Sequence, residues 1–523
     1  MSERHKTSTF RKSGGEKRGC IMRIILIETK APGPSIYDFA NVPRLGLPLL
    51  AAILTELGHE VRVYVESLSP VDWTEVKNAG LVGFSTITST APAAYMMCGR
   101  VRKMGIPTVI GGSHATFLPE EALQYCDFVV RGEGQKTLPM LVEALENSAT
   151  LAGISGLSYN DDLQGNICHN PDRPPCTQEE FTGLPTPALG LIAGHERISF
   201  TPVMTSWGCP HNCDFCSVVP MFGRKMRFRP VEAVLDELEI LNSSYVFFYD
   251  DNFVVDKQRT KAILRGIIER GLKLGWSAQM RAQAVFTKSG GRELDRDLLE
   301  LMRLSGCKAV YNGFESVNQA TLDAYEKHQS VSEISDAIDA FHQYDIHVHG
   351  MFVLGADTDG IRAPRETANF ALKHGIDTVQ LMVLTPFPGT RLRQRLSEQN
   401  RLLDIDWSHF DGHFCTFKPK QMNPAQLQKL SEKAMKRFYS LRRSMLILIR
   451  SLPRLIWRMQ RPWLRELLSG PSRRIQDVFG ESWEELKKYL RLPLLRLYAV
   501  KQMLGKQYQR RIKEHMTNLL ESR

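Results

Sequence analysis

The stretch WGCPHNCDFC, residues 207–216, is the most informative motif of this chain for fold and chemistry. It spaces three cysteines as Cys209-x-x-x-Cys213-x-x-Cys216, directly after PVMTSW at 202–207, which has the apolar pattern of a buried strand. Three thiolates on one loop can bind three irons of a 4Fe–4S cubane, which leaves the fourth iron open to an exogenous ligand. The spacing therefore predicts an iron–sulfur cluster whose open corner binds a small molecule.

A structural zinc site is the competing interpretation of the same loop. His211 lies between the first two cysteines, and a Cys3His set is an ordinary zinc site. The position of the loop favours the cluster, because the loop follows the first strand of a long strand–helix series, and active sites of barrels lie at such strand ends.

Six strand-like segments alternate with helical patterns from this loop onward. The strands are expected at 202–207, 245–250, 276–282, 308–314, 346–354 and 378–384, and the helices near 231–242, 257–272, 294–305, 331–344, 363–374 and 391–400. Six consecutive β–α units favour a partial (βα)6 barrel over a second open sheet.

Over about residues 195–400 the cysteine motif and the strand–helix series resemble the radical S-adenosylmethionine (SAM) superfamily. The resemblance implies a 4Fe–4S cluster that binds SAM, and it implies SAM contacts at Phe215, Asp250, Asp251, Arg281, Glu315 and Ser316. Asp250 and Asp251 end the second predicted strand, where members of the superfamily usually bind the SAM amino group. The resemblance likewise implies that Arg281 meets the SAM carboxylate and that GFES at 313–316 lies at the ribose. An Asp pair or an Arg at a strand end is also a common cap or surface charge.

From Met22 to Asn147 strands and helices alternate again, which indicates a parallel sheet with helices on both faces. Glycines follow two of its strands, in GGSHAT at 111–116 and RGEG at 131–134, and glycines at strand ends let a large ligand approach the backbone. This part resembles the cobalamin-binding domain of one radical SAM class. The resemblance implies cobalamin contacts at Gly111, Gly112, His114, Thr116, Gly132, Glu133 and Gly134. The alternative is a flavodoxin-like sheet with tight turns and no cofactor.

One feature departs from the wider cobalamin family. After the first strand, where Asp-x-His-x-x-Gly would supply a histidine to cobalt, the chain has KAPGPSIYDF at 30–39, without histidine. The lower axial ligand of a bound cobalamin is therefore expected not to be a protein imidazole.

The predicted fold is α/β: a Rossmann-like cobalamin-binding domain, a partial (βα)6 radical SAM barrel and a helical basic C-terminal region. The segments are 1–21, a disordered lead-in; 22–147, the cobalamin-binding domain; 148–194, a proline-rich linker; 195–400, the barrel; and 401–523, the basic region. Ten cysteines in 523 residues are too sparse for a disulfide framework, so a reducing cytoplasm is expected. The polar, basic lead-in lacks the apolar core of a signal peptide, and we predict no membrane span.

The net charge of +10 is unevenly placed. Residues 421–523 hold 23 Lys+Arg against 8 Asp+Glu, a balance of +15, so the body of the chain needs no polyanionic partner, and no nucleic acid is expected. Apolar residues recur at helical spacing over 427–448, and Trp, Leu and Arg mix beyond. Such helices either lie in a membrane interface, as a peripheral contact on its inner face, or cap the barrel with a solvated basic side.

Together the two domains imply a cobalamin-dependent radical SAM C-methyltransferase that acts on an unactivated carbon of a hydrophobic substrate. The chain resembles the methylases of polycyclic lipids, and a hopanoid is the expected substrate. An electron donor such as ferredoxin or flavodoxin is the implied partner. The alternative enzyme is a radical SAM cyclase or rearranging enzyme acting on a tetrapyrrole or other lipid, and the alternative without catalysis is a zinc-stabilised cobalamin or lipid sensor.

Overall fold

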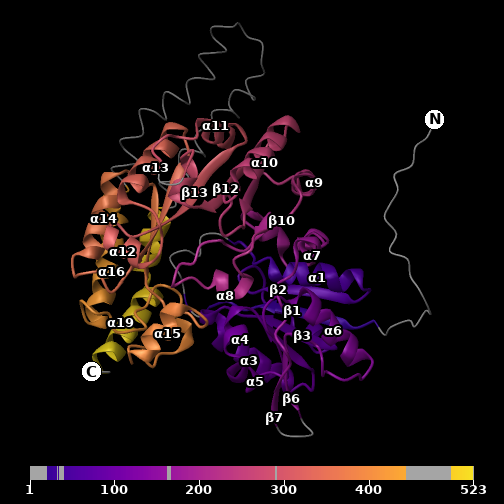
Figure 1. Ribbon diagram of the computed structural model, residues 1–523. Helices are drawn as coiled ribbons and strands as arrows, with labels where there is room; N and C mark the ends of the chain where they lie inside the picture. The colour runs from indigo at the N-terminus through magenta and orange to yellow at the C-terminus, as the bar shows by residue number, and fades with distance from the viewer. Residues whose placement is uncertain are drawn as a thin grey trace, which may run out of the picture.

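The computed structural model describes residues 21–31, 33, 41–161, 166–288, 291–442, 444 and 496–521. The N-terminal domain lies at the lower right of Figure 1, the second domain lies above it, and the last helix packs at the lower left. The lead-in predicted at 1–21 lies outside the described residues apart from Ile21.

The N-terminal domain is built on a seven-stranded sheet with the order β2-β1-β3-β4-β5-β6-β7. Its parallel strands are β1 (Arg23–Glu28), β2 (Glu60–Val65), β3 (Leu81–Ser85), β4 (Thr108–Gly111) and β5 (Phe128–Val130). The order reverses between β1 and β3, and in such sheets ligands bind outside the carboxyl ends of the strands at that point. The predicted Rossmann-like arrangement is confirmed.

Helices cover both faces of this sheet because its strands are apolar on both sides. Ile24 and Leu26 of β1 pack with α1 (Gly46–Glu56) and α6 (Gly134–Glu146). Ile25 and Ile27 face the opposite side, which is covered by α2, α3, α4 and α5. Those helices span Trp73–Val76, Ala91–Arg102, Ser113–Phe117 and Pro119–Leu123, and the short helix η1 (Thr88–Thr90) precedes α3.

The segment predicted as a linker, 148–194, contains ordered structure. Strands β6 (Leu157–Asp161) and β7 (Asn166–His169) extend the sheet in antiparallel fashion beyond β5. The short helix α7 (Gln178–Thr182) follows. The strands escaped prediction because each is four or five residues long and is set among Pro, Asn and Asp, which dominated the local pattern.

The second domain is a six-stranded parallel sheet in chain order, β8-β11-β12-β13-β14-β15. The strands are β8 (Thr201–Val203), β11 (Tyr245–Phe248), β12 (Gly275–Met280), β13 (Cys307–Glu315), β14 (His347–Leu354) and β15 (Thr378–Val383). The helices are α9 (Val231–Leu241), α10 (Lys257–Glu269), α11 (Arg296–Leu304), α12 (Gln319–Ala324), α13 (Val331–Gln343), α14 (Ala363–Lys373) and α15 (Arg391–Glu398). Among the described residues β15 does not pair with β8, so the barrel is partial, as predicted.

A small two-stranded element lies between β8 and β11. Strand β9 (Ser206–Trp207) pairs with β10 (Arg227–Phe228) in antiparallel fashion, and the loop between them carries the three cysteines and the helix α8 (Val218–Phe222). The pairing fixes both ends of the cysteine loop at the carboxyl end of β8.

Two described helices of the C-terminal region pack on the barrel. In α16 (Pro424–Phe438) the apolar face, with Leu427, Ala434 and Phe438, joins the barrel core, and α19 (Lys506–Glu521) contributes Tyr508 and Ile512 to the same core. The apolar sides of both helices are therefore covered by protein, as expected of a barrel cap. The Trp-rich stretch near 454–468 lies outside the described residues, and no described helix is long and apolar enough to cross a membrane.

We expect the docking of α19 to weaken as the pH falls from about 6.5 to about 4. His515 is 1% exposed, and burial lowers its pKa to about 4, with the neighbouring His409 adding to the effect. When the helix is undocked, the His515 imidazole is in water and binds a proton with its ordinary pKa of about 6.5. Because the undocked state then holds more protons across that window, stability falls as the pH falls.

Hydrogen–deuterium exchange of residues 506–521 at several pH values measures this effect. The equilibrium constant for opening, after correction for intrinsic exchange, should rise below pH 6. His515→Gln should reduce that rise, because Gln does not bind a proton in this range. Gln is the suitable replacement because it can still donate to the Cys415 carbonyl, which His515 contacts at 3.1 Å. An opening equilibrium independent of pH in the parent protein would contradict the prediction.

Candidate active site

A cavity of about 360 Å³ lies between the two domains, at the carboxyl ends of the N-terminal strands. We call it the first cavity. Its N-terminal side is formed by apolar side chains and by glycines, among them Gly111, Gly112, Gly132 and Gly134. Gly112 has φ +97°, and a Cβ added there would lie 2.3 Å from the Thr86 carbonyl oxygen. The glycines leave the strand ends open to a large ligand, which fits cobalamin at the switch point of the sheet.

Five of the seven residues predicted to contact cobalamin line the first cavity: Gly111, Gly112, Gly132, Glu133 and Gly134. Thr116 stands behind it and joins the two glycine turns, since its hydroxyl donates to the Gly112 carbonyl at 2.8 Å and accepts from the Gly132 N–H at 3.0 Å.

His114 does not line the first cavity. Its imidazole ring is fully buried, and its Nε2 lies 3.1 Å from a carboxylate oxygen of Glu121. The ring also packs edge-on against Trp407, with 5.1 Å between the ring centres. Sequence proximity to the glycine turn suggested a contact, but the first turn of α4 directs the side chain into the core. We therefore leave His114 out of the proposed contact set.

The opposite wall of the first cavity comes from the barrel and the cysteine loop. Trp207 precedes that loop, Ser217 follows Cys216, and Met221 and Phe222 belong to α8. The cavity thus reaches from the N-terminal glycine turns to the cysteine loop.

The cysteine loop is held in shape by backbone and ionic contacts. Gly208 begins it with φ +93°, and a Cβ there would lie 2.7 Å from the Lys225 carbonyl. Asp214 of the loop is 2.7 Å from Arg395 of α15 and accepts the Leu392 N–H through its carbonyl at 3.0 Å. Helix α15, more than 170 residues away in sequence, therefore fastens the loop.

The three predicted cluster ligands share this loop and are each half-buried. Burial raises the pKa of Cys209, and it raises the pKa of Cys216 to about 12, so these thiols need a cation to become thiolates. The Arg281 guanidinium lies beside these thiols. Burial lowers the pKa of Arg281, and the electrostatic interaction with Cys213 and Cys209 acts in the opposite direction. Three thiols and a neighbouring guanidinium fit an iron–sulfur cluster, whose irons bind thiolates. Among the described residues no three His, Cys, Asp or Glu side chains are placed to hold a single metal ion.

Two of the residues predicted to contact SAM, Arg281 and Glu315, are joined by a third residue, Lys327. Arg281 donates to the Lys327 carbonyl, and the Lys327 ammonium lies 2.7 Å from Glu315. Glu315 is held at φ +62°, and a Cβ at Gly313 would lie 2.5 Å from its carboxylate, which explains the glycine of GFES. Lys327 was missed because no motif marks it in the sequence.

Asp250 and Asp251, adjacent in sequence, have different surroundings. Asp250 is 1% exposed and accepts hydrogen bonds from the N–H groups of Thr205 and Ser206, both at 2.7 Å, so it holds the turn before the cysteine loop. Asp251 lines the first cavity, and its side chain is exposed there. The protein around the cavity and the charge of Asp250 raise the pKa of Asp251 above its ordinary value.

Two further predicted residues contribute packing and turn structure. Phe215 contacts the Tyr325 ring edge-on at 4.9 Å, which anchors the end of the cysteine loop to the barrel core. The hydroxyl of Ser316 accepts the Asn318 N–H at 3.0 Å and shapes the turn after β13.

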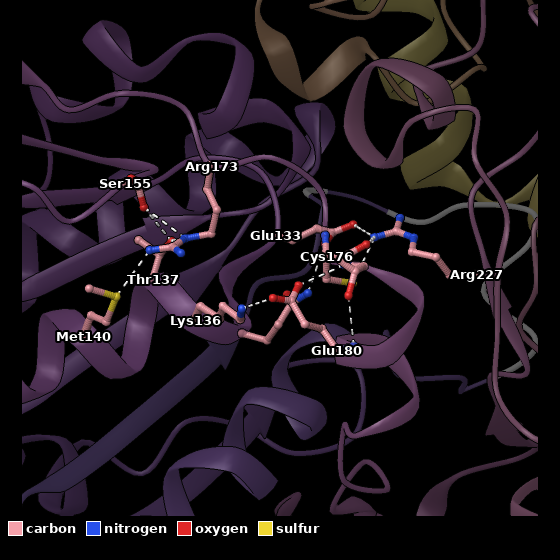
Figure 2. A network of polar contacts seen from close by, with 11 residues as sticks. Glu133, Lys136, Thr137, Met140, Ser155, Arg173, Cys176, Glu180 and Arg227 are labelled. Atoms are coloured by element: carbon pink, nitrogen blue, oxygen red, sulfur yellow. Dashed lines mark hydrogen bonds and ion pairs between the residues drawn. The ribbon is translucent and has the colours of Figure 1, made fainter.

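A buried polar network joins the N-terminal glycine turn to the cysteine loop (Figure 2). Glu133 forms an ion pair with Arg227 of β10, and both side chains are at most 4% exposed. The same carboxylate accepts the Cys176 N–H at 2.8 Å and the Gln135 amide at 3.0 Å, while Arg227 donates to the Phe222 carbonyl at 2.7 Å. Both oxygens of Glu133 are thus occupied by protein, and its role is to join the domains.

Two protein-family profiles match the chain: the B12 binding domain over residues 40–142 and the Radical SAM superfamily over residues 203–371. An uncharacterized methyltransferase of Pyrococcus horikoshii is 32% identical over 416 residues, which cover 76% of this chain and 88% of the relative. Bacteriochlorophyllide d C-12(1)-methyltransferase of Chlorobaculum tepidum is 25% identical, with 77% and 84% covered. Hopanoid C-3 methylase of Methylococcus capsulatus is 23% identical, with 72% and 74% covered.

Solved structures share the fold. The radical SAM methyltransferase TsrM from Kitasatospora setae, with cobalamin and a [4Fe-4S] cluster bound, superposes with a TM-score of 0.61 at 18% identity, covering 73% of this chain and 78% of that chain. The cobalamin-dependent enzyme OxsB, with aqua-cobalamin and S-adenosylmethionine bound, gives 0.63 at 16% identity, covering 96% and 79%.

Proposed function

The chain belongs to the cobalamin-dependent radical SAM family of methyltransferases, and from that premise we propose that it methylates a carbon of a hydrophobic substrate. It is an enzyme that uses a 4Fe–4S cluster, SAM and cobalamin. The first cavity supports this function most directly, because it joins the glycine turns of the cobalamin-binding domain to the cysteine loop of the barrel and has mainly apolar walls.

Cys209, Cys213 and Cys216 would hold the cluster, and the first cavity would hold cobalamin. Bound there, these groups supply reductive cleavage of SAM and a transferable methyl group. The residues of the chain provide placement. Arg281 with the Lys327–Glu315 pair offers a cation and a carboxylate for the charged end and ribose of SAM, and Asp251 offers a second carboxylate from the cavity wall. The apolar walls exclude water from the reaction.

Polycyclic substrates are supported by two named relatives, one acting on a bacteriochlorophyllide and one on a hopanoid. We propose that the substrate is a polycyclic compound, either a neutral hopanoid or a tetrapyrrole. The alternative to methylation is the closure of a ring on a tetrapyrrole. The discriminating experiment compares lipid and pigment extracts of a deletion strain with those of its parent by mass spectrometry. Loss of a species heavier by one CH2 supports methylation. Extracts in which no apolar compound changes mass would contradict the proposal.

We predict that bound cobalamin has no histidine nitrogen on its lower face. Among the described residues the lining of the first cavity contains no histidine, and the segment KAPGPSIYDF at 30–39, which follows β1 in the sequence, contains none either. Electron paramagnetic resonance of the cob(II)alamin form should therefore show the same nitrogen splitting in protein made with ordinary histidine and with 15N-histidine. A splitting that changes with the histidine label would contradict this assignment.

An electron donor such as ferredoxin or flavodoxin and a reducing cytoplasmic location belong to the same proposal, because the cluster must be reduced and its thiols kept free of disulfides. Peripheral membrane contact through the basic C-terminal region is a separate expectation. Co-sedimentation with anionic vesicles at low salt, reversed at high salt, would support it. Protein that stays in the supernatant with anionic and neutral vesicles alike would contradict it.

A further inference from the structure

Helix α15 lies at the boundary of the two domains and contacts more than the cysteine loop (Figure 1). Besides the contacts of this helix with Asp214, Arg391 donates to the Asn212 carbonyl of the loop. Arg393, in the same turn, has a different partner: its guanidinium carbon lies over the Trp407 ring, 4.9 Å from the ring centre. One helical turn therefore connects the cysteine loop to Trp407.

Trp407 reaches from the barrel side of this boundary to the cobalamin-binding domain. It begins the short helix η5 (Trp407–His409), and its indole N–H donates to the carboxylate of Glu121 in α5 at 3.0 Å. Glu121 also accepts the Tyr95 hydroxyl at 3.0 Å and lies 3.1 Å from His114 Nε2. Its carboxylate is therefore held by three side chains, two from its own domain and one from η5.

The charges on the two sides of Trp407 fit its ring. Burial would raise the pKa of Glu121, but hydrogen bonds, above all the one with His114, hold it below its ordinary value, so the carboxylate is ionised at neutral pH. Burial lowers the pKa of Arg393, and the charge of Glu121 acts in the opposite direction. The indole thus has a cation over its electron-rich face and an anion at its N–H, which is the favourable orientation for both.

His114 connects this set of contacts to the glycine turn at the first cavity. It lies in the first turn of α4, which begins directly after Gly112, and its ring packs edge-on against Trp407. Thr116 of the same helix binds both glycine turns. A continuous series of side-chain contacts therefore runs from the cysteine loop through α15 and Trp407 to the glycine turns.

The Glu133–Arg227 pair joins the same two domains at a different point, through β10, the strand that follows the cysteine loop. It shares no residue with the contacts of Trp407. While both connections are present, the two domains are held at two points. If one connection is removed, the domains can turn about the other, so the relative position of the domains depends on both.

We propose that Trp407, held between Arg393 and Glu121, is a positioning residue that sets the distance and orientation of the cluster relative to cobalamin. The inference rests on the proposed function, because it concerns the two cofactors assigned there. Trp407 does not line the first cavity, so it acts through the segments that it joins. Such positioning matters because a misplacement of about 1 Å can cost about a hundred-fold in rate.

The test measures the magnetic interaction between the two cofactors, which needs no substrate. The protein is loaded with cob(II)alamin and the reconstituted cluster, without SAM, and the cluster is reduced, so that each cofactor carries unpaired electron spin. The dipolar interaction between the two spins falls with the cube of their separation, and electron paramagnetic resonance of the frozen sample records it. We expect the parent protein to give one well-defined interaction.

Substitutions at the boundary should change this interaction. Trp407→Ala removes both the ring and the N–H, and we expect a weaker and broader interaction, because the domains can then turn about the Glu133–Arg227 pair. Trp407→Phe keeps a ring for Arg393 and should restore part of the parent signal. Arg393→Met removes the cation but leaves the indole bonded to Glu121, so its spectrum should lie between those of the parent and Trp407→Ala.

Trp73→Ala is the matched control. Trp73 is also half-buried and also lies under an arginine, with the Arg100 guanidinium carbon 3.5 Å from its ring centre, but both residues belong to the N-terminal domain. The substitution should therefore lower stability and leave the spin interaction as in the parent. A change as large in Trp73→Ala as in Trp407→Ala would overturn the proposal.

Iron content, cobalamin absorbance and urea unfolding are measured on the same preparations. Should Trp407→Ala not retain both cofactors, Trp407→Phe and Arg393→Met decide the question. If these variants are less stable but keep the parent interaction, Trp407 contributes to stability alone, and the positioning role fails while the proposed function stands. If the parent protein binds both cofactors and their spins do not interact, the proposed function fails, and the positioning role fails with it.

Discussion

The triple substitution Cys209→Ala, Cys213→Ala, Cys216→Ala is expected to remove the bound iron, from about four atoms per chain to a trace, and to abolish SAM cleavage. The three thiols share one loop, which the β9–β10 pairing holds at both ends and the Asp214–Arg395 contact holds within. Substitution by alanine leaves these contacts in place, so a loss of bound iron would show that the thiols are its ligands. Iron and sulfide analysis with the 5′-deoxyadenosine yield measures it.

Cys168→Ala is the matched control, since Cys168 is also partly exposed but lies on β7, far from the loop in sequence. Cobalamin binding by the triple variant shows that the N-terminal domain remains folded. Full iron content in the triple variant would contradict the cluster assignment.

Removing one partner of the Glu133–Arg227 pair is expected to lower the free energy of unfolding by about 3 to 5 kcal/mol. In Arg227→Met the Glu133 carboxylate stays buried without a cation, because the side chain is at most 4% exposed and its other contacts are the neutral N–H of Cys176 and amide of Gln135. The pair also joins the glycine turn to β10, so cobalamin affinity should fall in the same variant. Urea unfolding and cobalamin titration measure the two effects.

A double substitution separates the charge effect from the packing effect. Glu133→Gln with Arg227→Met removes both charges, and the double variant should recover part of the stability lost in Arg227→Met. Arg303→Met is the surface control, since its partner Glu300 and Arg303 itself are both exposed. If Arg227→Met lowers the free energy of unfolding by no more than Arg303→Met does, the Glu133–Arg227 pair does not stabilise the fold as predicted.

Much of the fold could be predicted from the sequence because local signals were strong. Apolar runs such as MRIILIE mark strands that are buried on both faces. The regular alternation of predicted strands and helices from 202 to 400 is compatible with few chain topologies. The cysteine loop was found because its chemistry depends on spacing alone. The glycine turns were found because a backbone that must pass close to a ligand excludes side chains.

The contacts that join distant segments could not be predicted. Glu133 was expected to face cobalamin, yet Arg227, 94 residues further on, occupies its carboxylate. Asp250 was grouped with Asp251, yet the two N–H groups of the preceding turn bind it. Trp407 belongs to no motif, and only the packing of the chain places it between Arg393 and Glu121. Such contacts depend on tertiary packing, which no local pattern records.

Methyl transfer from cobalamin requires that the cobalamin be methylated again after each turnover, so we propose that the chain uses SAM in two ways: SAM is cleaved reductively at the cysteine loop, and a second SAM donates its methyl group to the reduced cobalamin. The most direct measurement incubates the anaerobic, cofactor-loaded protein with SAM and a reductant and quantifies two products. We expect 5′-deoxyadenosine that disappears in the triple cysteine variant, and S-adenosylhomocysteine that persists in that variant but requires cobalamin. S-adenosylhomocysteine formed equally without cobalamin, or no 5′-deoxyadenosine from protein with a full cluster, would contradict it.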